Sequence, residues 1–262
     1  MAAVSVLDKP GLVRTTLSAD GVACVQMDDA ERKNALSHDL VAALGDAFAA
    51  LGRDHNVRAI VLAGLPDVFS TGATREVLAD LVTGRRDLGE LLLPRLLLDC
   101  PVPCLAAMAG YAVGGGFALG VAADIVLLAR ESRYTLNFMD LGFTPGMGTT
   151  RLLEHVVSTA VAHELLFSGE ARLGRDFDGK SGINYVLPRD DVLPRALALA
   201  ERIAEKPRAA LVALKRALSA PRRQAFEAAR TQEALMHAIS FGQADVIDRI
   251  DGVLGVGNDR KG

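Results

Sequence analysis

The stretch Ala109-Gly110-Tyr111-Ala112-Val113-Gly114-Gly115-Gly116-Phe117 follows directly on an apolar run, Cys104–Met108, that is typical of a buried strand. A second stretch, Phe69-Ser70-Thr71-Gly72-Ala73-Thr74, lies shortly after another apolar run at 57–63. Small residues at such turns let backbone N–H groups approach a ligand closely and point in one direction. Two converging N–H groups form an oxyanion hole for a carbonyl that gains negative charge. Taken alone, either stretch is equally consistent with a tight turn or close packing.

In the sequence on either side of these turns, apolar runs alternate with segments in which apolar residues recur at helical spacing. Ser37 is a predicted N-cap, because apolar residues recur after it at helical spacing through Leu51. This alternation of strands and helices, with strands that are apolar throughout, predicts a largely parallel sheet covered by helices. The predicted strands are Val22–Met27, 57–63, Cys104–Met108 and 124–129.

The C-terminal part differs in composition, because it is rich in Ala and Leu that recur at helical spacing. Because proline interrupts a helix, we expect breaks at Pro207 and Pro221. The sequence therefore predicts an α/β core over 1–190 and a helical region over 191–262, with a frayed tail from Gly252. The predicted helices are 158–167, 191–205, 208–218 and 222–241.

Composition excludes several classes of protein. The net charge of −3 gives no basic field for nucleic acid or an anionic membrane. Three cysteines are too few for a disulfide framework or a zinc site, so we expect a reduced, cytoplasmic protein. The uncharged segment 100–123 is long enough to span a bilayer, but its two prolines and glycine triplet favour a buried strand-loop-helix unit. Residues 1–10 carry no signal-peptide pattern, and the glycine spacing departs from the dinucleotide-binding fingerprint.

Taken together and in this order, the motifs are much more specific than either glycine stretch alone. The two glycine stretches, the run Arg32-Lys33-Asn34-Ala35-Leu36 and the turn Gly142-Phe143-Thr144-Pro145-Gly146-Met147-Gly148-Thr149-Thr150 resemble the crotonase (enoyl-CoA hydratase/isomerase) superfamily over nearly the whole chain. The resemblance implies a core of repeated ββα units with two roughly perpendicular sheets. It also implies a C-terminal helical region that forms trimers or hexamers and covers the active site.

The resemblance further implies a thioester substrate whose carbonyl lies in an oxyanion hole. By motif position, the donors are the backbone N–H groups of Thr71 and Gly115. The neighbouring residues Gly72, Ala73 and Gly114 are expected to line the substrate site.

Two departures from the hydratase pattern change the expected reaction. The positions of the two catalytic glutamates of hydratases hold Ala118 and Phe138, which line the site but cannot transfer a proton. Adding water across a double bond needs a base for the water and an acid for the carbon. Decarboxylation needs no such glutamate pair, because breaking the C–C bond itself delivers the electrons to the thioester. The site need only stabilise the enolate, hold the departing carboxylate and later supply a proton. The sequence therefore argues against hydratase activity and favours enolate chemistry without a metal or a cofactor.

Two further segments resemble one decarboxylase subgroup of this superfamily. Glu131–Met139 and Gln232-Glu233-Ala234-Leu235-Met236-His237 are similar to the decarboxylases of polyketide β-branching cassettes. That resemblance implies conversion of a 3-methylglutaconyl thioester on an acyl carrier protein to a 3-methylcrotonyl-type thioester. It also implies that His237 orients the carboxylate and helps to protonate the product, a role suited to an imidazole.

The subgroup also uses a lysine after the first oxyanion turn, and this chain has no lysine between Lys33 and Lys180. We expect an arginine to bind the carboxylate instead, because guanidinium groups bind carboxylates bidentately. The candidates are Arg75, Arg85 and Arg86. Arg32 and Lys33 occupy the region where relatives hold the pantetheine arm and the CoA nucleotide.

Two other functions stay open. An enoyl-thioester isomerase would share the enolate but move a proton instead of losing CO2. A catalytically silent trimer that binds acyl carrier protein would bind the same partner without turnover. Measuring CO2 release against double-bond migration separates the three.

Overall fold

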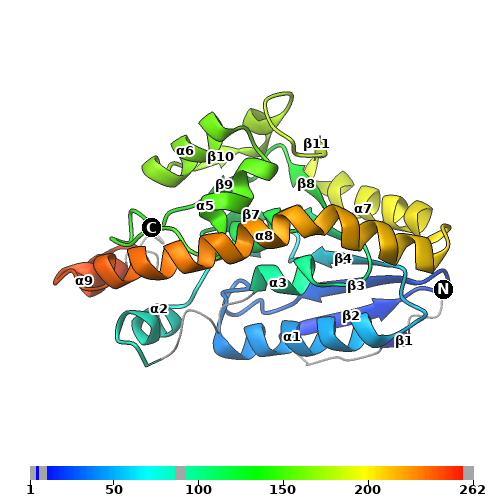
Figure 1. Ribbon diagram of the computed structural model, residues 1–262, viewed down its shortest axis with the longest axis horizontal. Helices are drawn as coiled ribbons and strands as arrows, with labels where there is room; N and C mark the ends of the chain where they lie inside the picture. The colour runs from blue at the N-terminus through cyan, green and yellow to red at the C-terminus, as the bar shows by residue number, and fades with distance from the viewer. Residues whose placement is uncertain (1–3, 6–10, 86–92, 256–262) are drawn as a thin grey trace.

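The computed structural model describes residues 4–5, 11–85 and 93–255 of the 262-residue chain. Within these ranges the strands form two sheets, in the orders β1-β2-β3-β4-β6-β8-β11 and β10-β9-β7-β5 (Figure 1). The strands of the larger sheet are β1 Val4–Ser5, β2 Val13–Leu17, β3 Val22–Met27, β4 Ala59–Ala63, β6 Cys104–Met108, β8 Ile125–Ala129 and β11 Tyr185–Leu187. Those of the smaller sheet are β5 Val68–Ser70, β7 Tyr111–Val113, β9 Arg133–Thr135 and β10 Arg172–Leu173.

The larger sheet is parallel from β3 to β11, while β1 and β2 add an antiparallel edge. Its central strands are buried on both faces. In β4, the side chains of Ile60 and Leu62 lie in the main core, whereas those of Ala59, Val61 and Ala63 lie in a second core. This alternation follows from the two-residue period of a strand. The predicted strands are confirmed, with β4 and β8 starting one or two residues later than expected.

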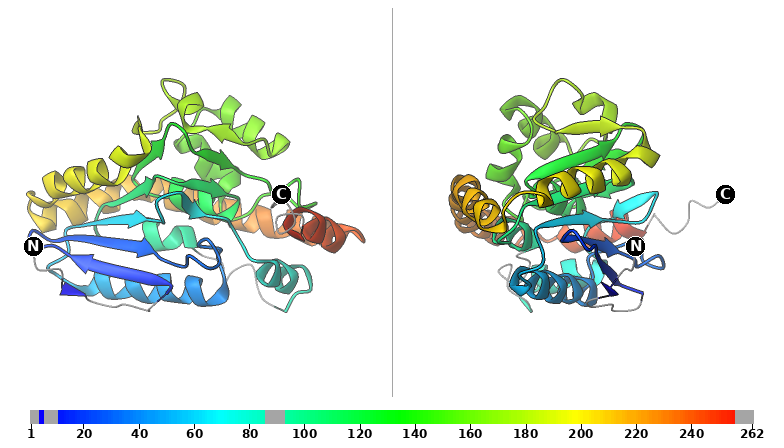
Figure 2. Two further views of the ribbon diagram at one scale, coloured as in Figure 1. Left: turned by 180° about the vertical axis from the view of Figure 1, so that it is seen from behind. Right: turned by 90° about the vertical axis from the view of Figure 1, so that its right-hand side faces the viewer.

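Helices cover both faces of the larger sheet (Figure 2). The side chain of Ser37 caps α1, which packs Leu40, Leu44 and Leu51 against the main core, and α7 lies on the other face. The helices are α1 His38–Arg53, α2 Arg75–Val82, α3 Leu93–Leu98, α4 Gly115–Val121, α5 Thr149–Leu152, α6 Thr159–Ser168, α7 Arg189–Ala204, α8 Arg208–Ser240 and α9 Val246–Gly255. Short 3₁₀ helices occur at Leu153–His155 and Gly174–Phe177.

The predicted break at Pro221 is wrong, because α8 runs without interruption from Arg208 to Ser240. A proline inside a helix removes one hydrogen bond and crowds the preceding turn. Here Lys215 lies before the proline and Arg222 lies after it. Lys215 binds Asp124 of the core, Arg222 pairs with the same carboxylate, and these contacts hold the helix in place. The break at Pro207 is confirmed, since α7 ends at Ala204 and α8 begins at Arg208.

The expected tail is also wrong in part. Residues 252–255 belong to α9, which buries Val246 and Ile250 in the main core. Residues 256–262 lie outside the described residues. The uncharged segment 100–123 contains β6, β7 and α4, as predicted. None of the helices in the described ranges combines the length and the apolar character that crossing a bilayer demands.

Candidate active site

The two glycine-bearing turns lie side by side. A Cβ atom placed on Gly72 would be 2.8 Å from the carbonyl oxygen of Val113 and 3.6 Å from the backbone nitrogen of Gly115. A Cβ on Gly116 would come within 2.6 Å of the Ser70 side chain. Only residues without side chains allow this approach. The structure therefore brings together the two turns that the sequence places about forty residues apart.

Buried polar residues fix the first turn. Asn34 is fully buried, and its amide nitrogen donates to the carbonyls of Met27 and Phe69, while its oxygen accepts from the N–H of Asp29. The Ser70 hydroxyl donates to the Asn34 carbonyl at 2.7 Å and accepts from the N–H of Gly72 at 3.2 Å. Asn34 and Ser70 had no predicted role of their own, although each lies within a quoted motif, 32–36 and 69–74. A polar side chain inside each motif was the available signal.

The second turn presents a backbone N–H at a helix start. Gly114 has φ 51° and ψ −119°, a conformation that favours glycine, and it precedes the first residue of α4, Gly115. The first N–H groups of a helix have no acceptor within it. The side chains of Met147 and Leu36 pack closely against Gly115. The N–H of Gly115 is thus placed beside the Thr71–Ala73 turn in a confined, largely apolar setting.

The two positions that hold glutamates in hydratases are apolar here and belong to the core. Ala118 is 1% exposed, and Phe138 is 7% exposed with its ring 6.1 Å from that of Phe143. Neither side chain has a proton to transfer. The geometry around these positions therefore offers no acid–base pair for water.

His237 of α8 is buried against the Gly142–Gly148 turn. Its ring stacks on Phe241 and its Nε2 lies 2.8 Å from the carbonyl oxygen of Thr144. Because a carbonyl only accepts, Nε2 must carry the hydrogen, which leaves Nδ1 as the unprotonated nitrogen of the neutral ring. Nδ1 is buried without a hydrogen-bond partner. Burial lowers the pKa of His237, with the Thr144 carbonyl opposing the shift, so the ring is neutral at pH 7.

Three buried polar residues on one face of α8 hold this turn. Glu233 accepts from the N–H groups of Gly148 and Thr150 and from the Thr150 hydroxyl. Ser240 accepts from the N–H of Thr144, completing a set with His237 at spacings of four and three residues. Burial raises the pKa of Glu233 despite these bonds. From the sequence, Glu233 was named only as a member of the segment Gln232–His237, with no role of its own.

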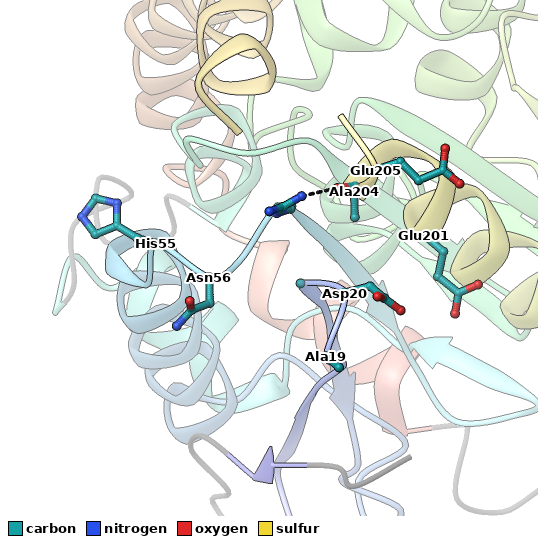
Figure 3. Close-up of a pocket in the computed structure, with 9 residues that line it drawn as sticks. Ala19, Asp20, His55, Asn56, Glu201, Ala204 and Glu205 are labelled. Atoms are coloured by element: carbon teal, nitrogen blue, oxygen red, sulfur yellow. Dashed lines mark hydrogen bonds between the residues drawn. The ribbon is translucent and has the colours of Figure 1, made fainter. Parts of the chain in front are cut away.

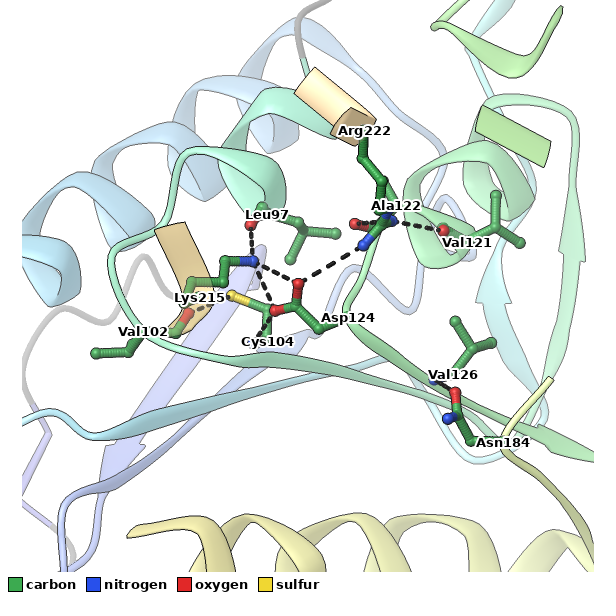
Figure 4. A network of polar contacts seen from close by, with 10 residues as sticks. All are labelled: Leu97, Val102, Cys104, Val121, Ala122, Asp124, Val126, Asn184, Lys215 and Arg222. Atoms are coloured by element: carbon green, nitrogen blue, oxygen red, sulfur yellow. Dashed lines mark hydrogen bonds and ion pairs between the residues drawn. The ribbon is translucent and has the colours of Figure 1, made fainter. Parts of the chain in front are cut away.

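An ion network anchors α8 to the core (Figure 4). Lys215 is 4% exposed as a residue. Its Nζ lies 2.6 and 2.7 Å from the two carboxylate oxygens of Asp124 and also donates to the Leu97 carbonyl. Arg222 donates to the Ala122 carbonyl and lies 3.6 Å from Asp124. Asp124 also accepts from the backbone N–H of Cys104 at 2.8 Å. This network sets the position of α8, and hence that of His237.

The two described arginines among the predicted carboxylate-binding residues contact aspartates rather than His237. Arg75 is the first residue of α2 and forms a bidentate pair with Asp251 of α9, at 2.5 and 2.7 Å. Arg85 pairs with Asp80 at 2.7 Å. Arg86 lies outside the described residues. No contact in the described ranges joins Arg75 or Arg85 to His237, and the binding of a substrate carboxylate by an arginine and His237 stays a prediction.

Arg32 and Lys33 form an exposed turn beside the first oxyanion turn. Arg32 lies 3.6 Å from Asp29, and Lys33 has φ 53°. The Thr71 hydroxyl donates to the Lys33 carbonyl at 3.4 Å, which places this basic turn next to the expected donor.

A group of side chains that offers metal ligands lies near α2. Within the described ranges, His38, Glu76 and Asp80 place one ligand atom each within 4.8 Å of one another. The Asp80 carboxylate is already engaged by His38 and Arg85. None of the predicted functions uses this group.

A polar cavity of about 610 Å³ lies where α7 meets the start of β3 and β4 (Figure 3). It is lined by Ala19, Asp20, Gly21, His55, Asn56, Arg58, Glu201, Ala204 and Glu205. Arg58 crosses it to donate to the Ala204 carbonyl. The lining includes none of the glycine-turn residues, so this cavity is distinct from the candidate active site.

Comparison with known proteins gives relatives along nearly the full chain. The family described as Enoyl-CoA hydratase/isomerase matches residues 18–254. The bacillaene synthase decarboxylase PksI of Bacillus subtilis is 41% identical over 232 residues, covering 88% of this chain and 93% of that protein.

Solved structures give the same result. A protein from a study of a dehydratase/decarboxylase enzyme couple involved in polyketide β-branching has a TM-score of 0.91 at 37% identity, covering 96% of this chain and all of that one. The ECH2 decarboxylase domain of CurF from Lyngbya majuscula has a TM-score of 0.85 at 34% identity, covering 93% and 99%.

Proposed function

Since the chain belongs to the enoyl-CoA hydratase/isomerase (crotonase) family, we propose that it decarboxylates a 3-methylglutaconyl-type thioester on an acyl carrier protein during polyketide β-branching. The product is a 3-methylcrotonyl-type thioester. The observation that carries the proposal is an oxyanion-hole geometry whose two acid–base positions are Ala118 and Phe138. The decarboxylase relatives support it.

The reaction needs the site to stabilise charge. The C–C bond to the carboxylate breaks, CO2 leaves, and the electron pair moves through the double bond onto the thioester oxygen as a dienolate. The N–H groups of Thr71 and Gly115 donate to that oxygen, and each such donor contributes roughly 3–4 kcal/mol of transition-state stabilisation. A proton then adds to carbon, and the thioester carbonyl re-forms. No metal or cofactor enters this sequence.

Binding the carboxylate falls to a cation near the first turn, and Arg75 is the best placed of the described arginines. It starts α2 directly after the turn Thr71–Thr74. His237 fixes the Gly142–Gly148 turn, whose Met147 packs on Gly115, so its effect reaches the second donor. Arg32 and Lys33 lie where the phosphopantetheine arm of an acidic carrier protein would approach.

The first prediction concerns hydration. We expect no loss of enone absorbance when crotonyl-pantetheine is incubated with the protein, because neither Ala118 nor Phe138 activates water. In parallel, a 3-methylglutaconyl thioester should release CO2, and a β,γ-enoyl thioester should not isomerise. Brisk hydration, or isomerisation without CO2 release, would contradict the proposed reaction. An Ala118→Glu variant serves as the control and should gain little hydration, because Phe138 still leaves the second group missing.

The second prediction concerns assembly. Two pairs of apolar side chains face outward near the two ends of α8, Leu214 with Leu218 and Leu235 with Ile239, each residue more than half exposed. Exposed apolar patches of this kind favour burial against another subunit. We expect sedimentation at micromolar concentration to report a trimer or a hexamer, and Leu218→Lys with Leu235→Lys to shift the population toward monomer. Lysine at exposed Ala213 is the control. A monomeric parent protein would contradict the assembly.

We also propose a cytoplasmic location. Cys100 and Cys104 are buried as free thiols, and Cys24 is partly buried with its pKa raised by burial to about 11. Unpaired thiols of this kind persist in a reducing compartment.

A further inference from the structure

The last described helix, α9, follows α8 at one end of the molecule and lies beside α2 (Figure 1). At one side Asp251 binds Arg75, the residue that starts α2 after the first oxyanion turn. At the other side Arg249 packs on Gly142, which opens the Gly142–Gly148 turn. Val246 and Ile250 anchor the opposite face of α9 in the main core. One short helix therefore touches both the start of α2 and the Gly142–Gly148 turn.

The contact between Arg75 and Asp251 has the form that a bound carboxylate would take. Nε and Nη2 of Arg75 meet one oxygen each of the Asp251 carboxylate, at 2.5 and 2.7 Å. Parallel N–H···O bonds of this kind are the preferred way in which a guanidinium binds any carboxylate. Both side chains are exposed, at 58% and 42%, so solvent and a ligand reach the pair.

We propose that Asp251 is an internal carboxylate that occupies Arg75 in the empty site, and that the carboxylate of the substrate displaces it. The inference rests on the proposed decarboxylation. It assigns Asp251 as a competing carboxylate that sets the affinity of Arg75 for carboxylate-bearing thioesters, whereas a thioester without a carboxylate does not exchange with it. Displacement needs no proton or electron transfer, only the exchange of one carboxylate for another on the same guanidinium.

The energetics favour exchange at Arg75 over Arg85. Exposed ion pairs contribute little to stability, so the Arg75–Asp251 pair opens readily. Arg85 instead binds Asp80, whose carboxylate is 18% exposed and is also held by His38. The Arg85 pair lies within one helix and its following turn, whereas the Arg75 pair joins two separate helices. Release of Asp251 would free α9 at its outer end without breaking the buried contacts of Val246 and Ile250.

The test uses two thioesters that cannot decarboxylate, glutaryl-pantetheine and butyryl-pantetheine, which differ in the terminal carboxylate. We expect Asp251→Asn to lower the Kd of glutaryl-pantetheine by about threefold to fivefold, the range that an exposed ion pair supports. The Kd of butyryl-pantetheine should not change. Arg75→Gln should weaken only the glutaryl compound, by about tenfold, and the double variant should match Arg75→Gln because the competing carboxylate then has no arginine to occupy.

The matched control is Asp245→Asn. Asp245 pairs with Arg249 in the same segment at 2.7 Å, with 56% exposure, but it has no contact with Arg75. It should leave both Kd values unchanged. Equal Kd values for glutaryl-pantetheine in the parent protein and Asp251→Asn, with folding intact by circular dichroism, would overturn the inference. CO2 release by the parent protein tests the proposed function separately, since the binding measurements need no turnover.

Discussion

A His237→Ala variant is expected to lose decarboxylase activity by about 10²-fold while keeping its fold. Alanine removes the Nε2–H that donates to the Thr144 carbonyl and the ring that stacks on Phe241. The Gly142–Gly148 turn then loses one of its three attachments to α8, and Met147 shifts against the Gly115 donor. A loss of about 10²-fold is typical when a remote substitution misplaces a catalytic group by about 1 Å. Single-turnover rates of CO2 release measure it, and circular dichroism checks the fold, which alanine suits as a helix former.

A His237→Gln variant separates positioning from proton transfer. Glutamine keeps an N–H donor for the Thr144 carbonyl but cannot give up a proton. Because the buried ring is neutral and its Nε2–H is committed to Thr144, we expect His237→Gln to retain most of the rate. If glutamine is as damaging as alanine, the imidazole carries the proton and the positioning role is wrong. His163→Ala, at an exposed position on α6, is the control and should not change the rate.

The second large effect concerns stability. Replacing Lys215 by methionine is expected to lower the free energy of unfolding by about 3 kcal/mol, because removal of one partner leaves a mostly buried carboxylate uncompensated. The value is at the low end for such a change, since Asp124 is 20% exposed and keeps Arg222 at 3.6 Å. The long apolar stem of methionine preserves the packing between α3 and α8. Urea unfolding followed by circular dichroism measures the loss.

A matched control and a second-site variant make this test specific. Lys206→Met removes an exposed lysine that pairs with Glu205 and should change stability by less than about 0.5 kcal/mol. Adding Asp124→Asn to Lys215→Met should recover part of the loss, because the unpaired carboxylate is removed while Arg222 keeps the carbonyls of Val121 and Ala122 as acceptors. Equal losses for Lys215→Met and Lys206→Met would show that the buried network does not hold α8.

Much of the fold could be predicted because apolar residues recur in the sequence with one spacing in strands and another in helices. Val22–Met27 and Cys104–Met108 were predicted with their observed bounds, since both are apolar runs between turn residues. The Ser37 cap and the buried stripe of α1 follow from helical spacing. The resemblance to the crotonase family rests on local motifs in order, and these also show that Ala118 and Phe138 replace two glutamates.

The prediction failed where a distant contact overrides a local rule. Pro221 is a strong local signal for a helix end, but the Lys215–Asp124–Arg222 network holds one helix across it. Gly252 suggested a frayed tail, while the burial of Ile250 in the main core and the packing of α9 against α2 stabilise the helix. Each of these contacts joins residues about ninety or more positions apart, so no short window of sequence contains both partners.

The sequence alone determined most of the strand and helix pattern, because residue type and spacing decide it locally. Its resemblance to the crotonase family predicts the two oxyanion turns and the replacement of both hydratase glutamates. The tertiary structure decided that His237 faces Thr144 with its Nε2 and that Asn34 and Ser70 fix the first turn. It also decided that Arg75 meets Asp251 rather than His237. Side-chain partners depend on how separate elements pack, and that packing is a property of the whole chain rather than of any one motif.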